Sequence, residues 1–268
     1  MSEYQWIRLE EAAPGVRRLL LHRPEKRNAI HNAMRGEILR ALQEADSDPA
    51  VRVTVISGAG PCFSSGYDLK SDLSADRPYF TAEVGQPWAR HVSEGWMSIW
   101  DLAKPVIAQV HGYALAGGLE LVGACDLAYA ASDARLGHPV LRFAGLPDFA
   151  WFPFFLAPRH AMELHLTGCE YTGEEAARIG LVNRAFAPGQ LDSRVLEIAR
   201  GIAESPASVV KVNKRFVHAV LEARGVRGGV RMAADLQAGP HLAEVMAAFG
   251  RPEELTRAVR DARRREEG

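Results

Sequence analysis

A glycine-rich turn followed by a glutamate is the segment of this sequence whose residues most clearly suit chemistry. Residues 112–118 contain three glycines, and Glu120 follows at the expected start of a short helix. Glycines let main-chain N–H groups approach a ligand closely, and the first turn of a helix adds the positive end of its dipole. The segment therefore predicts a site that stabilises an anion, with a carboxylate beside it that can carry a proton.

A second glycine-rich segment, residues 57–70, follows a run of β-branched residues. Gly58 and Gly60 suggest a dinucleotide-binding loop, but the third glycine of that pattern would fall at Phe63, so the pattern fails. The serines of the segment lack the spacing of a nucleophile elbow, which argues against a serine hydrolase. Two interpretations of its glycines stay open, a tight turn alone or a close approach of the main chain to a ligand.

Four segments of the chain resemble, in order and spacing, those of the crotonase family, which is also called the enoyl-CoA hydratase/isomerase family. They are residues 22–29, 63–70, 111–120 and 166–183, and the similarity extends over roughly residues 5–225. Each motif alone is moderately specific, whereas the four in sequence are strongly specific. The resemblance implies an enzyme that processes acyl-CoA thioesters.

The resemblance also implies an oxyanion hole made of the main-chain N–H groups of Tyr67 and Gly117, which would bind the thioester carbonyl and stabilise its enolate. Glu120 matches the first catalytic glutamate of the family's hydratases, and we expect it to exchange protons with water or with an α-carbon. The alternative is a glutamate that only favours the helix dipole.

The sequence departs from the family at the position of the second catalytic glutamate, where it has Val140. Valine cannot transfer a proton, which puts water addition by two glutamates in doubt. Asp148, eight residues later, matches the offset of a catalytic aspartate in the family's dienoyl-CoA isomerases and hydroxyacyl-CoA hydrolases, although it could instead cap the next helix. His138 could assist proton transfer or be structural. The aromatic run at residues 149–155 fits an apolar acyl pocket and core packing about equally well.

Coenzyme A would enter as part of the substrate, and no permanently bound cofactor or metal ion is implied. By the resemblance, the main chain near Ala29 and Ser65 contacts the adenine, and lysines meet the phosphates. Exposed lysines are commonly only solvated, which is the alternative for each of them. The residues expected to contact CoA are Lys26, Ala29, Ser65, Asp68, Lys70 and Lys214.

Strands and helices alternate up to about residue 190 and helices follow, which indicates an α/β fold with an all-helical C-terminal segment. By the resemblance, this is the crotonase-like spiral of β-β-α units. We expect a core over residues 1–195 and a helical segment over residues 196–268. The C-terminal helices are expected to build a homotrimer or a homohexamer.

Apolar periodicity and turn residues predict the elements that position these motifs. We expect strands at residues 16–21, 51–56, 105–110, 126–131 and 181–186. We expect helices at residues 33–45, 93–102, 152–166, 172–179, 190–204, 206–222, 235–249 and 253–264. The polar, irregular stretch at residues 71–92 indicates a lid or specificity loop.

Composition limits the partners and the compartment. The formal net charge of −1 argues against nucleic acid and anionic membranes as partners, and no apolar run is long enough to span a membrane. The first residues lack the pattern of a signal peptide. The three cysteines lack the spacing of a zinc site or of a disulfide framework. We therefore expect a cytoplasmic protein.

Three functions stay open on these grounds. The first is hydration or isomerisation of an enoyl-CoA, with Glu120 and Asp148 as the acid–base pair. The second is hydrolysis, either of an acyl-CoA thioester or of a carbon–carbon bond in a cyclic β-keto acyl-CoA. The third is a CoA-binding subunit without catalysis, which Val140 would allow and the two retained carboxylates argue against.

Overall fold

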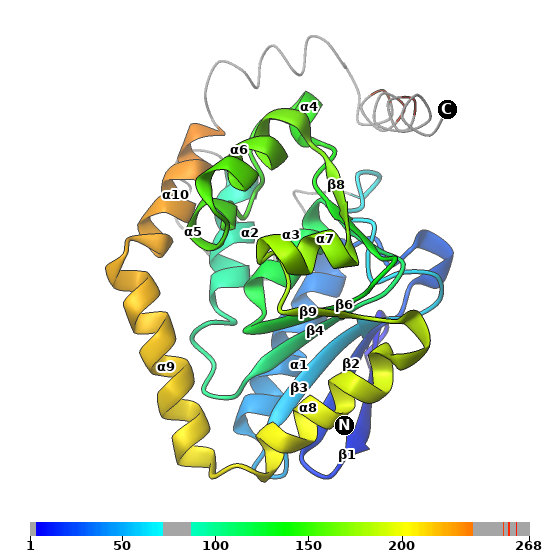
Figure 1. Cartoon of the computed structure of the whole chain (residues 1–268), viewed down its shortest axis with the longest axis vertical. Coiled ribbons are helices and arrows are strands. Elements are labelled where there is room, and N and C mark those ends of the chain that lie inside the picture. The colour runs from blue at the N-terminus through cyan, green and yellow to red at the C-terminus, as the bar shows by residue number, and fades with distance from the viewer. Residues whose placement is uncertain (1–3, 72–86, 238–253, 255–256, 258–260, 262–268) are drawn as a thin grey trace.

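Two sheets organise the part of the chain that the structure describes, which in this computed structural model is residues 4–71, 87–237, 254, 257 and 261 (Figure 1). The larger sheet has the strand order β1-β2-β3-β4-β6-β9, and the smaller has the order β5-β7-β8. The strands are β1 Ile7–Ala13, β2 Val16–Leu21, β3 Val53–Gly58, β4 Val106–Val110, β5 Tyr113–Leu115, β6 Leu127–Ala131, β7 Arg135–Gly137, β8 Glu170–Thr172 and β9 Arg184–Phe186.

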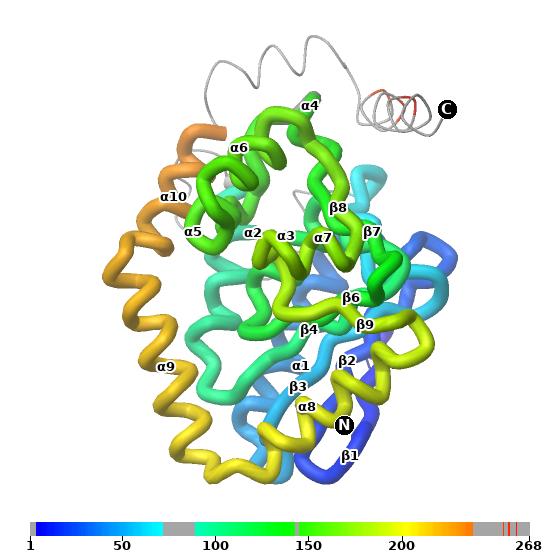
Figure 2. The backbone as a smooth tube through the Cα atoms, viewed as in Figure 1, coloured from blue at the N-terminus to red at the C-terminus, as the bar shows by residue number. Residues whose placement is uncertain are grey.

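Helices cover the sheets, and α9 and α10 run along one side of the molecule (Figure 2). No helix in the described parts of the chain is long and apolar enough to cross a membrane. The helices are α1 Asn32–Ser47, α2 Pro87–Met97, α3 Gly117–Ala124, α4 Leu141–Ala144, α5 Phe152–Phe155, α6 Pro158–Thr167, α7 Gly173–Ile179, α8 Leu191–Glu204, α9 Ala207–Ala223 and α10 Val226–Leu236, with the 3-10 turns η1 Pro24–Lys26 and η2 Pro188–Gln190.

The larger sheet is parallel except at β1, which pairs antiparallel with β2. β3 and β4 are buried along their whole length, as parallel strands are when helices cover both faces. Val53, Val55 and Ile56 give β3 the β-branched side chains that suit this position. Helix α8 crosses one face of the sheet and packs against all six strands.

The two glycine-rich loops leave the sheet at the same edge, because β3 and β4 are parallel neighbours. They then pair with each other: Ser64 N donates to the Tyr113 carbonyl over 3.1 Å, and Leu115 N donates to the Ser64 carbonyl over 3.0 Å. Gly112 has a φ of 61°, and a Cβ there would lie 2.0 Å from the Pro61 carbonyl oxygen. Glycine is therefore required where the two loops cross.

The predicted α/β fold with a helical C-terminal segment is confirmed. The strand expected at residues 16–21 coincides with β2, and Thr172 and Glu175 form the capping box that opens α7. The single helix expected over residues 152–166 is wrong, since α5 ends at Phe155 and α6 begins at Pro158. Proline has no N–H to continue the helical ladder, and it suits the first turn of a new helix.

Several elements were not expected from the sequence, namely β1, α4, α10, the 3-10 turns η1 and η2, and the three-residue strands of the smaller sheet. Short strands leave too few residues for a periodic pattern to show. Within the expected lid at residues 71–92, residues 87–92 belong to α2, and residues 72–86 lie outside the described part of the chain. The helices expected at residues 235–249 and 253–264 lie almost wholly outside it as well.

The boundary expected after residue 195 falls inside α8. Because α8 packs on the sheet, it belongs to the α/β layer, and the helices that leave the sheet begin with α9. α9 and α10 contact each other, and α10 contacts α2. The physical boundary of the C-terminal segment therefore lies between Glu204 and Ala207.

Helix α9 is tied to the segment before β6 by a buried cluster of charged side chains. Lys214 Nζ lies 2.9 Å from Asp126 Oδ2, and His218 Nε2 lies 2.8 Å from Asp126 Oδ1. Lys214 Nζ also donates to the carbonyls of Ile99 and Lys104 over 3.2 and 3.0 Å. The Lys214 and His218 side chains are only 5% and 7% exposed, so their partners must come from the protein.

Replacing Asp126 by alanine is expected to lower the free energy of unfolding by about 3–5 kcal/mol, because Lys214 would stay buried without its carboxylate. The double variant Asp126→Ala/Lys214→Met is expected to recover part of that loss, since no uncompensated charge then remains. Urea denaturation of both variants measures the two effects. Strictly additive losses for Asp126→Ala and Lys214→Met would contradict the coupling.

Candidate active site

The first segment of the site, residues 23–29, holds the loop that follows β3 in place through hydrogen bonds. Asn28 has a φ of 52° and points its amide into this loop. Its Nδ2 donates to the carbonyls of Ala59 and Cys62, both over 2.9 Å, and Arg23 N donates to its Oδ1 over 2.9 Å. Ser64 Oγ donates to the Asn28 carbonyl over 2.8 Å. The buried Asn28 thus fixes residues 23–29 and the loop after β3 relative to each other.

The main chains of Tyr67 and Gly117, the two expected oxyanion-hole residues, lie close together. Gly66 has a φ of 104°, and a Cβ there would lie 2.9 Å from the Leu115 carbonyl oxygen and 3.2 Å from Gly117 N. Gly117 opens α3 after Ala116, whose φ is 48°. Only a residue without a side chain lets the first loop pass this close to the start of α3.

The Tyr67 side chain crosses from the first loop to α3. Its ring lies against Gly117, where an added Cβ would come within 2.6–2.7 Å of three ring carbons. Its hydroxyl donates to Glu120 Oε2 over 2.6 Å. Trp96 Nε1, from α2, donates to the same hydroxyl over 2.8 Å. The predicted carboxylate and the predicted oxyanion-hole loop are therefore joined by a tyrosine hydroxyl.

Glu120 is held by donors from three parts of the chain. Besides Tyr67, His138 Nε2 lies 3.1 Å from Glu120 Oε1, and the main-chain N–H of Asp148 donates to the same oxygen over 3.0 Å. Glu120 is 1% exposed, so these contacts replace the water that a carboxylate would otherwise bind. The expected pair Glu120 and Asp148 is brought together.

A buried arginine from α1 adds positive charge to the site. Arg35 is 1% exposed, donates to Asn32 Oδ1 over 2.9 Å, and has a guanidinium nitrogen 2.9 Å from His91 Nδ1. Burial lowers the pKa of Arg35 to about 10, while the charges of Asp148 and Glu120 act in the opposite direction. Arg35 therefore stays charged at neutral pH.

The Tyr67 phenol stays protonated because it is buried beside two carboxylates. Burial, and then the charges of Glu120 and Asp148, raise the pKa of Tyr67 well above its usual range, whereas Arg35 opposes the shift. A neutral phenol can donate its proton to Glu120 and accept a hydrogen bond from Trp96, as the contacts show.

Val140 occupies the N-cap position of the short helix α4. His138, two residues earlier, makes the contact to Glu120 instead. In the aromatic run that follows, Phe149, Trp151 and Phe152 are buried in the hydrophobic core. Of the two interpretations of this run, core packing accounts for these three side chains.

The residues expected to contact CoA fall into two groups. Those from residues 23–29 and 64–70 lie together. Ser65 N donates to the Arg27 carbonyl over 3.0 Å. The Arg23 guanidinium donates to the Ala29 carbonyl and lies 3.0 Å from Asp68 Oδ2. Lys214 lies apart from this group, in its ion pair with Asp126. The residues gathered around the first loop are Lys26, Ala29, Ser65, Asp68 and Lys70.

Three residues of the site were missed from the sequence: Arg35, His91 and Trp96. Arg35 carried a signal, because it lies three residues before Ile38 and four before Leu39, on the apolar face of its helix. A charged residue at a core position requires a buried partner. His91 and Trp96 carried no comparable signal, since their roles depend on side chains from distant segments.

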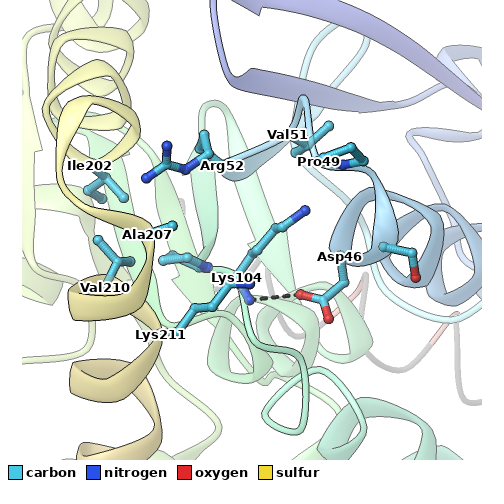
Figure 3. A pocket seen from close by; sticks show the side chains of 11 residues that line it. Asp46, Pro49, Val51, Arg52, Lys104, Ile202, Ala207, Val210 and Lys211 are labelled. Carbon is cyan, nitrogen blue, oxygen red and sulfur yellow. Dashed lines mark hydrogen bonds between the residues drawn. The ribbon is translucent and has the colours of Figure 1, made fainter.

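A cavity of about 340 Å³ opens at the opposite edge of the sheet (Figure 3). Arg52 and Lys104, which precede β3 and β4, line it together with Lys211 of α9. Lys104 N donates to Asp46 Oδ1 over 2.8 Å, and Lys104 Nζ donates to the Ala45 carbonyl over 2.9 Å. Lys104 thus ties chain segments together at the amino ends of the strands, away from the glycine-rich loops.

The side chains around Glu120 suit proton transfer beside the start of α3. Glu120, Tyr67 and Asp148 can exchange protons, and Arg35 supplies buried positive charge. Within the described residues, no group of three or more His, Cys, Asp or Glu side chains is placed to hold a metal ion.

Gly117→Ala is expected to destabilise the protein by about 1–3 kcal/mol, because the new methyl group would overlap the Tyr67 ring. Gly201→Ala is the control, since α8 leaves open space around Gly201 and alanine there favours the helix. Thermal unfolding compares the two variants. Equal stability of Gly117→Ala and the unchanged protein would show that the ring does not rest on Gly117.

Comparison with known proteins finds relatives along most of the chain. The family model described as enoyl-CoA hydratase/isomerase matches residues 11–249. A mevalonyl-coenzyme A hydratase of Aspergillus fumigatus is 33% identical over 247 residues, covering 88% of each chain. A hydroxycinnamoyl-CoA hydratase-lyase of Pseudomonas fluorescens is 32% identical over 230 residues, covering 80% of each.

Solved structures show the same architecture. The crystal structure of an enoyl-CoA hydratase/isomerase from Xanthobacter autotrophicus has a TM-score of 0.83 and 35% identity, covering 97% of this chain and 99% of that one. An enoyl-CoA hydratase from Mycobacterium smegmatis has a TM-score of 0.84 and 27% identity, covering 99% and 94%. With the family model matching most of its length, this chain belongs to the enoyl-CoA hydratase/isomerase, or crotonase, family.

Proposed function

We propose that this chain hydrates an enoyl-CoA thioester, or shifts its double bond, through a thioester enolate. The observation that carries the proposal is the buried Glu120 carboxylate, which lies in the first turn of α3 and contacts the loop that contains Tyr67. Relatives named as hydratases of CoA thioesters support the same class of reaction.

In this proposal the enolate oxygen is bound by the main-chain N–H groups of Tyr67 and Gly117. Gly117 begins α3, so its N–H lies at the positive, N-terminal end of that helix. Gly66 supports the arrangement, because it lets the first loop approach Gly117 N. One such donor is typically worth ~3–4 kcal/mol in the transition state.

Glu120 and Asp148 form the acid–base pair of the proposed reaction. Water addition needs one group to exchange a proton with water and another to exchange a proton with the α-carbon. Val140 can do neither. The N–H of Asp148 donates to Glu120 Oε1 over 3.0 Å, so the two acidic residues are neighbours, and both of their charges act on Tyr67 and Arg35.

CoA is proposed to bind along the two segments that Asn28 joins, residues 23–29 and 64–70. Lys26 and Lys70 are exposed there and supply positive charge for phosphates. Lys214 of the same chain is engaged with Asp126, so its position lends no support to a direct CoA contact.

A homotrimer or homohexamer is proposed on the exposed apolar side of α9. Val212 and Phe216 are 67% and 66% exposed, which is unusual for large apolar side chains on one helix face. A face of this kind is buried when copies of a chain associate. The exposed apolar residues of α9 are Val209, Val212, Phe216, Val217 and Val220.

The catalytic proposal is tested with crotonyl-CoA and a longer 2-enoyl-CoA, following products by mass. The unchanged protein is expected to add one water or to move the double bond. Glu120→Gln and Asp148→Asn are each expected to lower kcat by ~10²–10⁴-fold, because each removes a group that exchanges a proton. Glu204→Gln, at the exposed end of α8, is the control and keeps full activity.

Two outcomes would contradict the catalytic proposal. Release of free thiol from the CoA ester without hydration would identify a thioester hydrolase. Activity of Glu120→Gln within about tenfold of the unchanged protein, a difference of ~1.4 kcal/mol, would remove Glu120 from the chemistry.

The oligomer proposal is tested by changing α9. Phe216→Glu is expected to shift the assembly to monomers, because it places a charge in the buried centre of the interface. Arg215→Gln, at the neighbouring exposed position, is expected to leave the assembly unchanged. Light scattering after size-exclusion chromatography gives the mass of each variant. An unchanged mass for Phe216→Glu would place the interface elsewhere.

A further inference from the structure

The cavity at the amino ends of the strands has the build of a ligand site (Figure 3). Its volume of about 340 Å³ falls within the range of roughly 300–1,000 Å³ that is usual for ligand pockets. Apolar residues such as Val51, Ile202 and Val210 form much of its wall, and a few charged side chains interrupt them. A wall of this kind suits a small molecule that has both an apolar part and a charged part.

Three cations and one carboxylate line this cavity. The cations are Arg52, Lys104 and Lys211, and Asp46 is the only acidic residue among the described residues of the lining. The Asp46 carboxylate is engaged by the main chain, because its Oδ1 accepts the N–H of Lys104 over 2.8 Å. The lining therefore has three positive charges against one negative charge.

Arg52 and Lys104 keep their charge while they hold the chain in place. Lys104 Nζ donates to the carbonyls of Ala45 and Asp48. An Arg52 guanidinium nitrogen donates to the Ser205 carbonyl. Carbonyl groups carry no net charge, so these hydrogen bonds fix the two side chains without neutralising them. Their positive charge is available to a ligand in the cavity.

Lys211 adds a cation with unused hydrogen-bond donors. It lies on α9, is exposed, and makes no hydrogen bond or ion pair with the residues that the structure describes. An ammonium group has three N–H donors. Lys211 can therefore donate to a ligand without giving up a contact within the described part of the protein.

The three cations are close enough to repel one another. Burial lowers the pKa of Lys104, and the charges of Lys211 and Arg52 lower it further. The charges of Asp46 and Asp48 oppose this shift. A hollow lined mainly by charges of one sign concentrates ions of the opposite sign. An anion in the cavity would thus relieve a repulsion that the protein alone leaves in place.

We propose that this cavity binds a small organic phosphate, with its phosphate group near Arg52, Lys104 and Lys211 and its carbon group against the apolar wall. A phosphate monoester has a charge of about −1.5 to −2 at neutral pH, which matches the excess of positive charge better than a monocarboxylate does. Guanidinium and ammonium groups both bind phosphate oxygens through charge-assisted hydrogen bonds.

The phosphate site is separate from the proposed active site and does not depend on the reaction at Glu120. Arg52 and Lys104 precede β3 and β4, whereas the glycine-rich loops follow these strands. The two sites therefore lie at opposite ends of the same parallel strands. Loss of one site by mutation is expected to leave the other intact.

The test measures the affinity for butyl phosphate by isothermal titration calorimetry. One molecule per chain is expected to bind, and Lys211→Met is expected to weaken binding on the order of 10–100-fold, because it removes a charged hydrogen-bond donor. Arg200→Met is the matched control, since it removes an exposed positive charge of α8 outside the cavity and is expected to keep the affinity within about twofold. Absence of binding, or equal affinity of Lys211→Met and the unchanged protein, overturns the site.

Thermal unfolding without ligand shows that Lys211→Met loses binding and not its fold. The variant is expected to unfold at the same temperature as the unchanged protein or at a higher one, because one of three mutually repelling charges is gone. If unfolding at a lower temperature accompanied the loss of affinity, Lys211 would be a structural residue, and the assignment of its ammonium group to the ligand would be wrong.

Two further ligands test the chemical class. Inorganic phosphate lacks the carbon group, and butyrate has a single negative charge, so butyl phosphate is expected to bind more tightly than either. Butyrate binding as tightly as butyl phosphate would overturn a phosphate as the ligand. Inorganic phosphate binding as tightly would overturn the role of the apolar wall.

Competition with butyryl-CoA separates the cavity from the proposed CoA site. Saturating butyryl-CoA is expected to leave the affinity for butyl phosphate within about threefold, because the two ligands occupy opposite ends of the strands. Displacement of butyl phosphate by butyryl-CoA would place both in one site and overturn the proposal. Hydration of enoyl-CoA, measured separately, is expected to be the same in Lys211→Met and in the unchanged protein.

Discussion

The pairing of the two glycine-rich loops is the constraint on which the rest of the site depends. Parallel pairing of β3 and β4 sends both loops to one edge of the sheet, and the Ser64 hydrogen bonds to Tyr113 and Leu115 then hold them together. Asn28 closes the arrangement from a third segment. The loops come this close only because glycine stands at the crossing points. The position of Tyr67 relative to α3 is a consequence of this backbone geometry.

Burial of charge is the second constraint on the site. Glu120 and Arg35 are each 1% exposed, and a buried charge is tolerated only where donors or acceptors replace its water. Helices α1 and α2 and the loops near residues 67, 138 and 148 supply these partners. Loss of one of them leaves another buried group unsatisfied. The network therefore holds the carboxylate in one orientation without help from the substrate.

The backbone of the site could be predicted from the sequence because glycines and helix starts have local causes. The resemblance to the family implied that the segments around Tyr67 and Gly117 would meet, whereas the capping box of α7 was predicted from local sequence to the residue. Side-chain partners could not be predicted in the same way. The Tyr67 hydroxyl meets Glu120, 53 residues later in the chain, and no local pattern encodes that contact.

The partner of Lys214 was also not predictable from the sequence. Resemblance suggested a phosphate partner, but the ammonium group lies in an ion pair with Asp126 and donates to two carbonyls. The pattern of an amphipathic helix shows which face is buried, but it does not show which charged side chain on the neighbouring element contacts that face. The break between α5 and α6 was foreseeable, since Pro158 marks it, whereas the three-residue strands of the smaller sheet were not.

Val140 and His138 together limit the negative charge near Glu120. A carboxylate at position 140 would bring a further negative charge to a region that already contains Glu120 and Asp148, and like charges at short range oppose ionisation. His138 instead brings a ring nitrogen to 3.1 Å from Glu120 Oε1, and its Nδ1 is buried without a partner in the described part of the chain. The contact with Glu120 therefore orients the ring. The described part of the chain therefore surrounds the Glu120 carboxylate with groups from Tyr67, His138 and the Asp148 main chain, and Val140 adds no second glutamate to it.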